Sequence, residues 1–431
     1  MSGTEATVRA GWPALGLAAV LACAAGPPPP ATLRVGTSGD YAPFSQAGDR
    51  APAGFDVEVA RAFARDVGLE LEWVRFRWPE LARDVAAARF DVAMSGVTVR
   101  PERSVAGRFG VPVASSGAVV LARPAHAAGG LEGLDRATVR IAVNAGGHLE
   151  HSARAAFPRA SLRVLPENDA VRRALAQGDV DAIVTDTREA PHWQPSLPDA
   201  VLLGPFTRDR KAYLWATEAS QAEAMDAWLL AREADGTLAR LRARWLGAPG
   251  PPTATPLEAL IAASAERLDL MPLVAEAKRA AGRPVRDRSR EARVLETAWS
   301  DVQRQAEAAR APPPDRARVA DFYRAQIEAA VAVQERVLAG PATPGPRFDL
   351  DRELRPALLR LGDRMAWALV RLDRVPERRA LATALDAELE RFGLRPSHRE
   401  AWVEALLGWA QSRARARANS PAITGSSSDA P

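Results

Sequence analysis

The first half of the chain alternates short apolar runs with stretches of helical spacing. Apolar runs at residues 33–37, 69–76 and 90–94 have the length and composition of buried strands. Residues 55–67 repeat apolar side chains every three or four positions, as a helix that packs on a sheet does. Strands that alternate with helices predict a parallel sheet covered on both faces.

The same alternation restarts after residue 125 and predicts a second small sheet. The expected strands of this second sheet are 139–143, 162–165 and 180–184. A further strand at 211–216 is expected to return to the first sheet. We therefore predict a two-lobed α/β domain over residues 32–248, with a cleft between the lobes. Lobe 1 takes about 32–125 and 206–248, and lobe 2 takes about 126–205.

The pattern changes beyond a linker rich in Gly and Pro at residues 247–253. Residues 254–416 keep a helical periodicity, and no convincing strand is predicted there. Three long helices are expected first, and about three more follow. The expected ranges are about 255–281, 288–310 and 316–339. The second domain is therefore predicted to be an all-α bundle, followed by a disordered tail over 417–431.

The start of the chain has the pattern of an export signal. Residues 1–25 carry a thin positive charge at Arg9 and then a small apolar stretch too short to span a bilayer. This predicts a periplasmic protein. The run Val20-Leu21-Ala22-Cys23 also resembles a bacterial lipoprotein processing box, with a lipid anchor on Cys23. Plain cleavage just after it is the alternative. Because Cys23 is the only cysteine, no disulfide within the chain is expected.

Composition narrows the class of partner. The 431 residues are 47% hydrophobic and carry a formal net charge of only +4. No dense stripe of Lys and Arg interleaved with aromatic residues is present, which argues against nucleic-acid binding. The expected partners are small molecules, and no pattern predicts a metal or another cofactor. Self-association stays open.

Residues 89–103, reading RFDVAMSGVTVRPER, carry the first candidate chemistry. A buried strand ends at Met94, and Ser95, Thr98 and Arg103 follow it. In an open α/β sheet, ligands bind beyond the carboxyl ends of the strands. Arg is the side chain best shaped to grip a carboxylate. The segment therefore predicts a carboxylate clamp, and a strand followed by a turn and a solvated Arg is the alternative.

This clamp closely resembles that of the extracellular solute-binding proteins for polar amino acids, and the resemblance covers about residues 33–245. It favours the clamp. Asp186 stands where those proteins hold a substrate ammonium, but Glu189 stands where they usually have an apolar residue. An ionised Glu189 is unfavourable in a cleft built for anions. It becomes useful if burial raises its pKa and it delivers a proton. A surface Glu on a short helix is the alternative.

Several further motifs resemble the periplasmic cyclohexadienyl dehydratases, a catalytic branch of the same fold. They include Gly39-Asp40-Tyr41, Gly54-Phe55-Asp56, Trp78-Pro79, Glu102-Arg103, Val143-Asn144, Gly146-Gly147, Glu189-Ala190 and Lys211-Ala212-Tyr213. The resemblance implies loss of water and carbon dioxide from prephenate or arogenate, with Glu189 as the acid. The implied substrate ligands are Asp40, Trp78, Ser95, Thr98, Arg103, Asn144, Gly147, His148, Asp186 and Lys211. One departure is His148-Leu149, where the dehydratases usually have Thr-Asn.

The helical half has its own polar candidates. Arg267 and Lys278 are eleven residues apart, about three helical turns, so they share one helix face. Gln334 lies within an apolar run, where an amide needs a hydrogen-bond partner. In an Arg-rich chain, plain solvation of the basic side chains is the alternative.

Together with Asp287, Arg290 and Glu291, these residues resemble the all-helical chorismate mutases, and a later Arg364 fits their secreted class. The resemblance covers about residues 256–409. It implies the pericyclic conversion of chorismate to prephenate, which needs no metal and no nucleophile. The implied ligands are Arg267, Arg290 and Arg364 for the two carboxylates, Lys278 and Gln334 for the ether oxygen, Glu291 for the hydroxyl, and Asp287 as a further contact.

The two implied reactions are consecutive, because the product of the C-terminal domain is the substrate of the N-terminal one. The expected protein is therefore a bifunctional enzyme that leads from chorismate to phenylpyruvate or phenylalanine. Two alternatives stay open. The first half can be an amino-acid binding protein of a transport or sensory system with a fused mutase, and the helical half can be a structural or dimerisation module.

Overall fold

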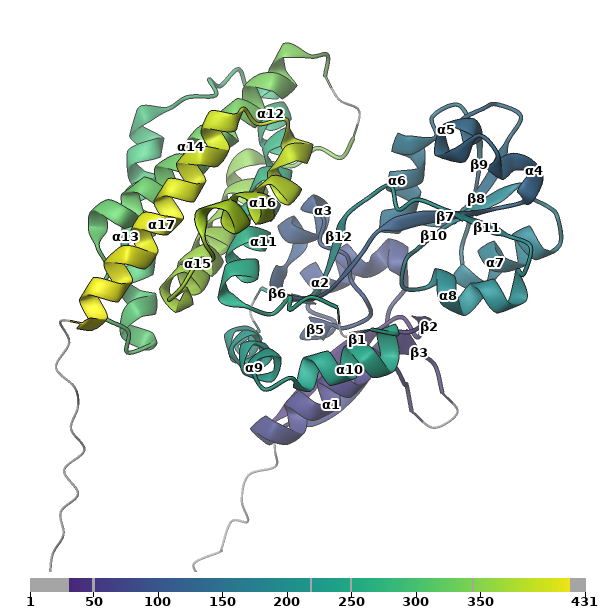
Figure 1. Ribbon diagram of the computed structural model, residues 1–431, viewed down its shortest axis with the longest axis horizontal. Coiled ribbons are helices and arrows are strands. Elements are labelled where there is room, and N and C mark those ends of the chain that lie inside the picture. Colours follow the sequence, from purple (N-terminus) through teal and green to yellow (C-terminus); the bar gives the residue numbers. More distant parts are fainter. Residues whose placement is uncertain (1–30, 49–50, 218, 249, 343–344, 419–431) are drawn as a thin grey trace, which may run out of the picture.

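The computed structural model describes residues 31–48, 51–217, 219–248, 250–342 and 345–418. The predicted leader with Cys23, and the predicted tail beyond residue 418, lie outside the described residues. Figure 1 shows two α/β lobes and a bundle of helices packed beside one of them. The fold is therefore the predicted combination of a two-lobed α/β unit and an all-α unit.

Lobe 1 is built on a five-stranded mixed sheet with the order β4-β1-β5-β12-β6. The strands are β1 (Thr32–Thr37), β4 (Glu70–Arg75), β5 (Val92–Ala93), β6 (Arg108–Ser116) and β12 (Asp209–Trp215). The first three run parallel, as predicted, and β12 pairs antiparallel with both β5 and β6. The helices of this lobe are α1 (Phe55–Val67), α2 (Leu81–Ala86), α3 (Pro101–Ala106), α9 (Ala222–Ala234) and α10 (Thr237–Leu246). Its smaller elements are β2 (Asp40–Tyr41), β3 (Ser45–Gln46) and the 3-10 turn Trp78–Glu80.

Lobe 2 has a sheet with the order β11-β7-β10-β8-β9. The strands are β7 (Ala118–Ala122), β8 (Arg140–Asn144), β9 (Ser161–Leu165), β10 (Ala182–Asp186) and β11 (Val201–Leu203). Its helices are α4 (Pro124–Ala127), α5 (Gly130–Leu134), α6 (His148–Ala156), α7 (Asn168–Ala176) and α8 (Ala190–Trp193), and a 3-10 turn spans Gln194–Ser196.

The first crossing between the lobes lies at residue 117, not near residue 125 as expected from the sequence. The strand β7 pairs antiparallel with β10 and β11, so residues 118–122 belong to lobe 2. The apolar run 118–122 follows β6 almost directly. The sequence pattern of a buried strand is the same whether the strand pairs in the sheet of lobe 1 or in that of lobe 2. Its backbone pairing alone assigns it to a lobe.

The C-terminal unit is all helical in its described residues. It consists of α11 (Pro256–Asp269), α12 (Met271–Ala280), α13 (Arg288–Ala308), α14 (Arg316–Ala339), α15 (Arg355–Arg371), α16 (Arg378–Leu389) and α17 (Pro396–Ala418), with a π turn at Leu350–Leu354 and a 3-10 turn at Glu390–Phe392. The predicted first helix is divided at Leu270, since Pro272 in the first turn of α12 has no N–H to continue the ladder. Asp287 and Asp315 accept backbone N–H bonds and cap α13 and α14.

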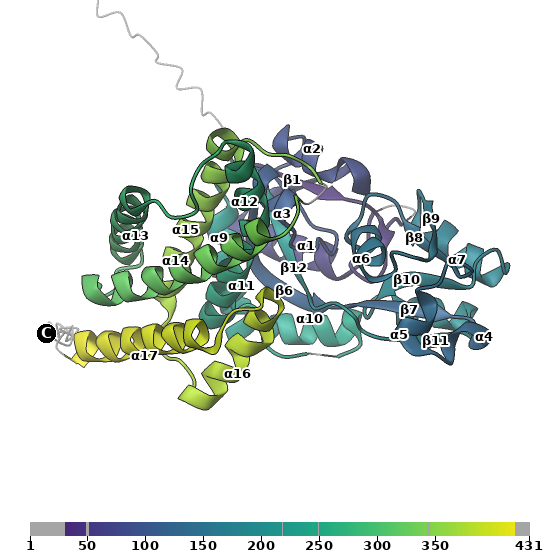
Figure 2. The same ribbon diagram turned by 90° about the horizontal axis from the view of Figure 1, so that it is seen from above.

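The helical unit packs firmly on lobe 1. Figures 1 and 2 both show α11 between the other helices and β6, and α11 and α15 contact β6 and α3. Val113 of β6 and Leu260 of α11 lie in one continuous hydrophobic core. Arg360 donates to the Ser104 and Val105 carbonyls at 3.2 and 2.9 Å. The mutase-like helices are therefore a fixed extension of lobe 1.

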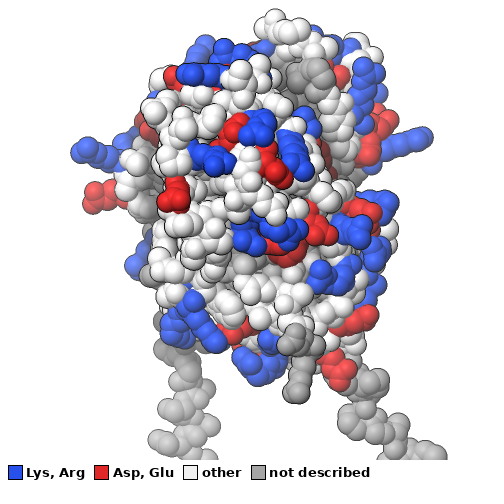
Figure 3. Space-filling view, turned by 90° about the vertical axis from the view of Figure 1, so that its right-hand side faces the viewer, with Lys and Arg blue, Asp and Glu red and all other residues white. Residues whose placement is uncertain are grey.

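The surface is mixed in charge. On the face shown in Figure 3, basic and acidic side chains are interspersed. Within the described ranges, no helix is long and apolar enough to cross a membrane, and no group of three or more His, Cys, Asp or Glu side chains is arranged to hold a metal ion.

Candidate active sites

The first cavity lies between the lobes, where the carboxyl ends of β5 and β10, the start of α6 and the strand β12 converge. It is lined by Tyr41, Trp78, Gly96, Thr98, Arg103, Asn144, Gly147, His148, Leu149, Asn168, Asp186, Glu189 and Lys211. The sequence analysis singled out most of these side chains. The cavity volume is only ≈30 Å³, room for about one or two water molecules. The lobes are therefore closed on one another.

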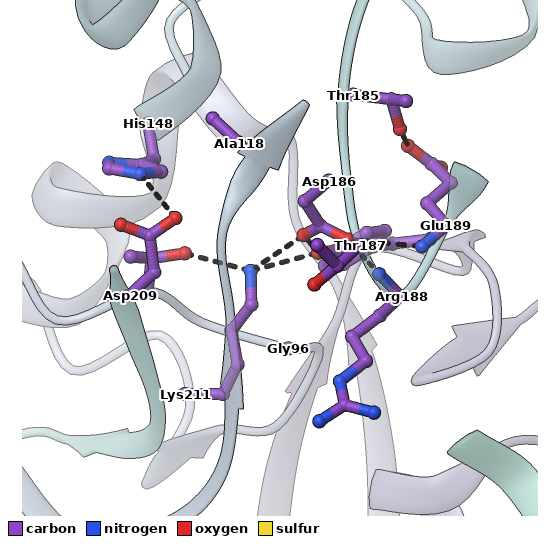
Figure 4. A network of polar contacts seen from close by, with 12 residues as sticks. Gly96, Ala118, His148, Thr185, Asp186, Thr187, Arg188, Glu189, Asp209 and Lys211 are labelled. Carbon is purple, nitrogen blue, oxygen red and sulfur yellow. Dashed lines mark hydrogen bonds and ion pairs between the residues drawn. The ribbon is translucent and has the colours of Figure 1, made fainter. Parts of the chain in front are cut away.

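Lys211 is the centre of the contacts that join the lobes. Its Nζ donates to the Tyr41 hydroxyl at 2.8 Å, to the Thr98 hydroxyl at 2.9 Å and to Asp186 at 3.1 Å. The Tyr41 hydroxyl donates to the same Asp186 oxygen. Burial opposes ionisation of Asp186, but Lys211, Tyr41 and two backbone N–H groups outweigh it and lower the pKa of this carboxyl. Figure 4 shows Lys211 reaching Asp186 across the cleft.

Glu189 is 1% exposed and lies beside this network. Its two oxygens accept hydrogen bonds from Thr185 at 2.8 Å and from Asn168 at 3.2 Å. Burial, and then the negative charge of Asp186, raise the pKa of Glu189 well above its ordinary value. Two neighbouring carboxyls thus have pKa values moved in opposite directions, the arrangement of an acid beside a permanent anion.

Arg103 is a cation of the cleft without an ion pair among the described residues. It is buried, donates to the Thr98 carbonyl at 2.9 Å and lies over the Trp78 ring at 5.7 Å from the centroid. Burial and the neighbouring Arg100 lower its pKa to about 9. It forms no ion pair with any carboxylate in the described part of the chain, so its guanidinium is available to a ligand carboxylate.

His148 begins α6 at the rim of this cavity. Its Nε2 lies 2.9 Å from Asp209 Oδ2, as Figure 4 shows. Burial lowers the pKa of His148, although Asp209 opposes the effect. Asn144, at the end of β8, has a buried Oδ1 without a partner, and Gly147 packs directly against its side chain. Of these three residues, Asn144 thus offers an acceptor that no other described residue uses.

Two expected ligands are placed elsewhere. The Ser95 hydroxyl is buried among Ser38 and Ser45 at 2.8 and 2.5 Å, where it ties loops of lobe 1 together. The Asp40 carboxylate is exposed and accepts from Trp78 Nε1 at 3.2 Å, outside the cavity lining. Neither side chain lines the closed cavity, so the substrate contacts expected for Ser95 and Asp40 stay predictions.

Four lining residues, Tyr41, Gly96, Leu149 and Asn168, were not among the expected ligands, and two of them contribute polar side chains. Tyr41 belongs to the quoted Gly39-Asp40-Tyr41 motif, so the sequence held a signal for it. Asn168 begins α7, and its amide donates to both the Asp40 carbonyl and Glu189. Nothing local marks Asn168, because its role depends on two partners distant in the sequence.

The second cavity lies inside the helical unit and is larger, ≈380 Å³. It is enclosed by α11 to α15 and contains the predicted Arg267, Lys278, Asp287, Arg290, Glu291 and Gln334. Arg267 and Lys278 both face this cavity, as their spacing predicted. They do so from two consecutive helices, α11 and α12, rather than from one. This volume suits a small organic ligand.

The basic groups of this cavity are only partly satisfied by the protein. Arg267 donates to the Gln326 carbonyl at 3.1 Å, and burial lowers its pKa to about 10. Lys278 Nζ donates to the Val285 carbonyl at 2.7 Å, and burial, followed by repulsion from Arg355, lowers its pKa. Arg290 forms no side-chain ion pair among the described residues. Such groups gain from an anionic ligand.

Two acceptors in the same cavity also lack partners among the residues that the structure describes. Gln334 is 5% exposed, its Nε2 donates to the Ala330 carbonyl at 3.2 Å, and its Oε1 has no partner. Glu291 Oε1 is likewise buried and unpartnered. Because unsatisfied buried polar atoms are costly, these side chains indicate that a ligand completes the hydrogen bonds of this cavity.

Arg364 does not belong to this cavity. Its guanidinium donates to Glu266 at 2.6 Å and to the Gly110 carbonyl at 3.2 Å, at the contact between α15 and lobe 1. The expected carboxylate contact of Arg364 is therefore corrected. Arg355, at the start of α15, lines the cavity instead, together with Arg293, and an ion pair with Asp351 positions it.

The fold and its two cavities define the class of protein, an α/β cleft protein of the solute-binding kind with an appended helical enzyme domain. The chain belongs to the bacterial extracellular solute-binding proteins, family 3, which match residues 33–248. Chorismate mutase type II matches residues 258–335, within the helical unit.

Individual relatives match the N-terminal half. The chain is 35% identical over 220 residues to the cyclohexadienyl dehydratase of Pseudomonas aeruginosa. The aligned residues make up 50% of this chain and 82% of that protein. It is 27% identical over 221 residues to the L-cystine-binding protein TcyJ of Escherichia coli, covering 50% and 83%. A crystal structure of an ancestral amino acid-binding protein, described as a precursor of cyclohexadienyl dehydratase, shares 30% identity with a TM-score of 0.46, covering 50% of this chain and 95% of that one.

Proposed function

We propose that the protein is a bifunctional enzyme that converts chorismate to prephenate in residues 254–416 and dehydrates prephenate or arogenate in residues 32–248. The observation that carries the proposal is Glu189, a buried carboxyl with a raised pKa. The same cleft holds Arg103, which has no ion pair with any residue that the structure describes. A binding protein has no use for such an acid, whereas a dehydratase requires a proton donor.

The dehydration needs one proton and a fixed orientation. Arg103 and Thr98 hold the side-chain carboxylate of the substrate, and Glu189 faces the ring hydroxyl. The bond from the ring to its carboxylate breaks, its electron pair moves through the ring, and the carbon–oxygen bond to the hydroxyl breaks. Glu189 gives its proton to the departing oxygen, so water and carbon dioxide leave and the ring becomes aromatic. Solvent then reprotonates Glu189.

The mutase step is a rearrangement within one molecule. Arg267, Arg290 and Arg355 face the cavity and are placed to hold the two carboxylates of a folded chorismate. Lys278 and Gln334 donate to the ether oxygen as its bond to carbon breaks, and Glu291 accepts from the hydroxyl. Fixing a flexible dianion in a reactive shape, and stabilising charge on the ether oxygen, account for catalysis of this kind.

The direct test is to incubate the full chain with chorismate and follow prephenate and phenylpyruvate with time. We expect chorismate to disappear, prephenate to rise and fall, and phenylpyruvate to accumulate. Added arogenate should yield phenylalanine if the cleft accepts the amino substrate. Absence of prephenate would reject the mutase assignment, and prephenate that persists would reject the dehydratase assignment.

A second candidate for the N-terminal half is binding of an amino acid, supported by the likeness to TcyJ and by Asp186 at the expected ammonium position. The ion pair between Lys211 and Asp186 already neutralises that carboxylate. A heat-shift screen with amino acids discriminates, since a binding protein should be stabilised by at least one of them and remain inert toward prephenate.

We also propose a periplasmic location, with lipidation of Cys23 as the variant to be tested. Mass spectrometry of the mature protein from its host measures this directly. A chain that keeps Met1 contradicts export, and a diacylated Cys23 selects the lipoprotein form.

A further inference from the structure

A third cavity lies where lobe 1, lobe 2 and the helical unit meet. Its volume is ≈280 Å³, and its walls come from the start of α3, from α6, from the start of β12 and from α11. His148 of α6 lines both this junction cavity and the cleft. Glu266 of α11 lines it, and the next residue, Arg267, lines the mutase-like cavity. The junction cavity is therefore adjacent to both candidate active sites.

The acidic side chains of the junction cavity are already neutralised within the protein. Asp269 receives two hydrogen bonds of 2.7 Å from Arg391. Glu266 pairs with Arg364 at 2.6 Å, and Asp209 faces His148 at 2.9 Å. These carboxylates therefore repel an incoming anion less than their number suggests.

Two arginines of the same cavity are poorly satisfied. The Arg208 guanidinium makes one contact of 3.5 Å, to the Ala387 carbonyl, and no ion pair within the described residues. In the described part of the chain, the Arg100 guanidinium contacts only Glu102, at 3.3 Å or more. His151 lies in the same wall, and burial, followed by the charge of Arg100, lowers its pKa. The region around Arg100 and Arg208 thus favours a negatively charged guest.

We propose that the junction cavity binds a small organic dicarboxylate, with Arg100 and Arg208 each contacting one carboxylate. The anionic class follows from the two arginines. The choice of a dicarboxylate rests on the proposed function, because prephenate is a dianion and must travel from one active site to the other. The volume is near the lower end of the range for small-ligand sites, so it admits a single ring with short substituents.

The dicarboxylate ligand can come from two sources. It is either released by the helical unit or taken up from solution. The helix α11 lines both the junction cavity, through Glu266, and the mutase-like cavity, through Arg267. From either source, the cavity serves as a holding site beside the cleft, with which it shares His148.

The binding test uses the full chain and phthalate, an unreactive aromatic dicarboxylate, in calorimetric titration. The background protein carries Arg103→Gln and Arg290→Gln, which remove carboxylate contacts from both candidate active sites. We expect one phthalate per chain, and we expect Arg100→Gln with Arg208→Gln to weaken its affinity by about tenfold to a hundredfold. Arg100→Lys with Arg208→Lys keeps both charges and should retain most of the binding.

The control is Arg65→Gln, which removes a surface charge of lobe 1 whose nearest carboxylate contact is 3.9 Å long. It should leave phthalate affinity unchanged. No phthalate binding in the background protein, or binding that Arg100→Gln with Arg208→Gln leaves intact, would overturn the proposal. This outcome is independent of the proposed function, since phthalate undergoes neither reaction.

A second experiment distinguishes the sources in otherwise wild-type protein supplied with chorismate. If the ligand comes from the helical unit, the Arg100→Gln, Arg208→Gln protein should accumulate several times more free prephenate than wild type while consuming chorismate at the same rate. If the ligand comes from solution, prephenate accumulation should be unchanged and added phthalate should compete with added prephenate only in the wild type. Both outcomes support the site, and insensitivity of both readouts to the substitutions contradicts it.

Discussion

The two candidate active sites differ in how their charged groups are satisfied. In the cleft, Lys211 and Asp186 pair with one another, and the enclosed volume is ≈30 Å³. In the helical unit, Arg290 has no ion pair among the described residues, Gln334 and Glu291 have unpartnered oxygens, and the volume is ≈380 Å³. In the cleft, the central charged pair is therefore satisfied within the protein, although Arg103 and the Asn144 oxygen are not, whereas the helical cavity leaves several groups for a ligand.

This difference follows from how each site is built. The cleft lies between two lobes, and the contacts of Lys211 and Tyr41 with Asp186 join one lobe to the other. A substrate must break these contacts and separate the lobes before it can bind. The second cavity lies within one packed helical unit, so its arginines are held in place without a ligand. We therefore expect domain motion to limit dehydration and preorganisation to govern the mutase step.

The largest expected effect is that of Glu189→Gln. The amide keeps the size of the side chain and loses the transferable proton, so dehydration of prephenate should fall by about a hundredfold to ten-thousandfold. Chorismate consumption should be unchanged, so prephenate accumulates. Rates of both half-reactions are measured on the same preparation. Phenylpyruvate formation at the wild-type rate would show that Glu189 is not the acid, and His148 would be the next donor to test.

The reciprocal change is Arg290→Ala in the preorganised cavity. Loss of one charge-assisted contact to a substrate carboxylate should lower kcat/KM for chorismate by about tenfold to a hundredfold. Dehydration of added prephenate should stay within the error of wild type. A matched loss in both reactions would mean that the substitution unfolds the chain, which the circular dichroism spectrum would reveal.

A third pair of variants separates the two arginines of α15. Arg355→Ala should reduce kcat/KM for chorismate by about tenfold with little loss of stability, because Arg355 faces the cavity. Arg364→Ala should leave catalysis intact and destabilise the protein by about 3–5 kcal/mol, since it strands the buried Glu266. Chorismate kinetics and calorimetric unfolding measure the two effects. The reverse pattern would restore Arg364 to the active site.

The smallest effect is a change of pH profile. The raised pKa keeps Glu189 protonated through neutral pH, so dehydration should be flat there and fall as pH rises through that pKa. Mutase activity should stay level across the same range, because the amide of Gln334 donates without titrating. Gln334→Glu should make the mutase fall with rising pH as well. A mutase profile unchanged by this substitution would place Gln334 away from the ether oxygen.

Most of the local structure could be predicted from the order of the residues alone. The predicted helices over 288–310 and 316–339, and the strands at 33–37 and 139–143, agree with the elements found. Glu189 was identified only through the resemblance to the solute-binding proteins, which usually have an apolar residue at this position. Strand periodicity, helix caps and strand-end positions depend on neighbours along the chain, so they can be inferred without the fold.

Tertiary structure alone decided which side of an element a polar residue faces. Arg364 and Arg355 lie on one helix, yet the first contacts lobe 1 and the second lines the cavity. Ser95 follows the expected strand but bonds to two serines of its own lobe, and Asn168 gains its role from Glu189 on another element. The physical reason is that a side chain's partners come from elements distant in sequence, and only their packing selects among the directions that local pattern leaves open.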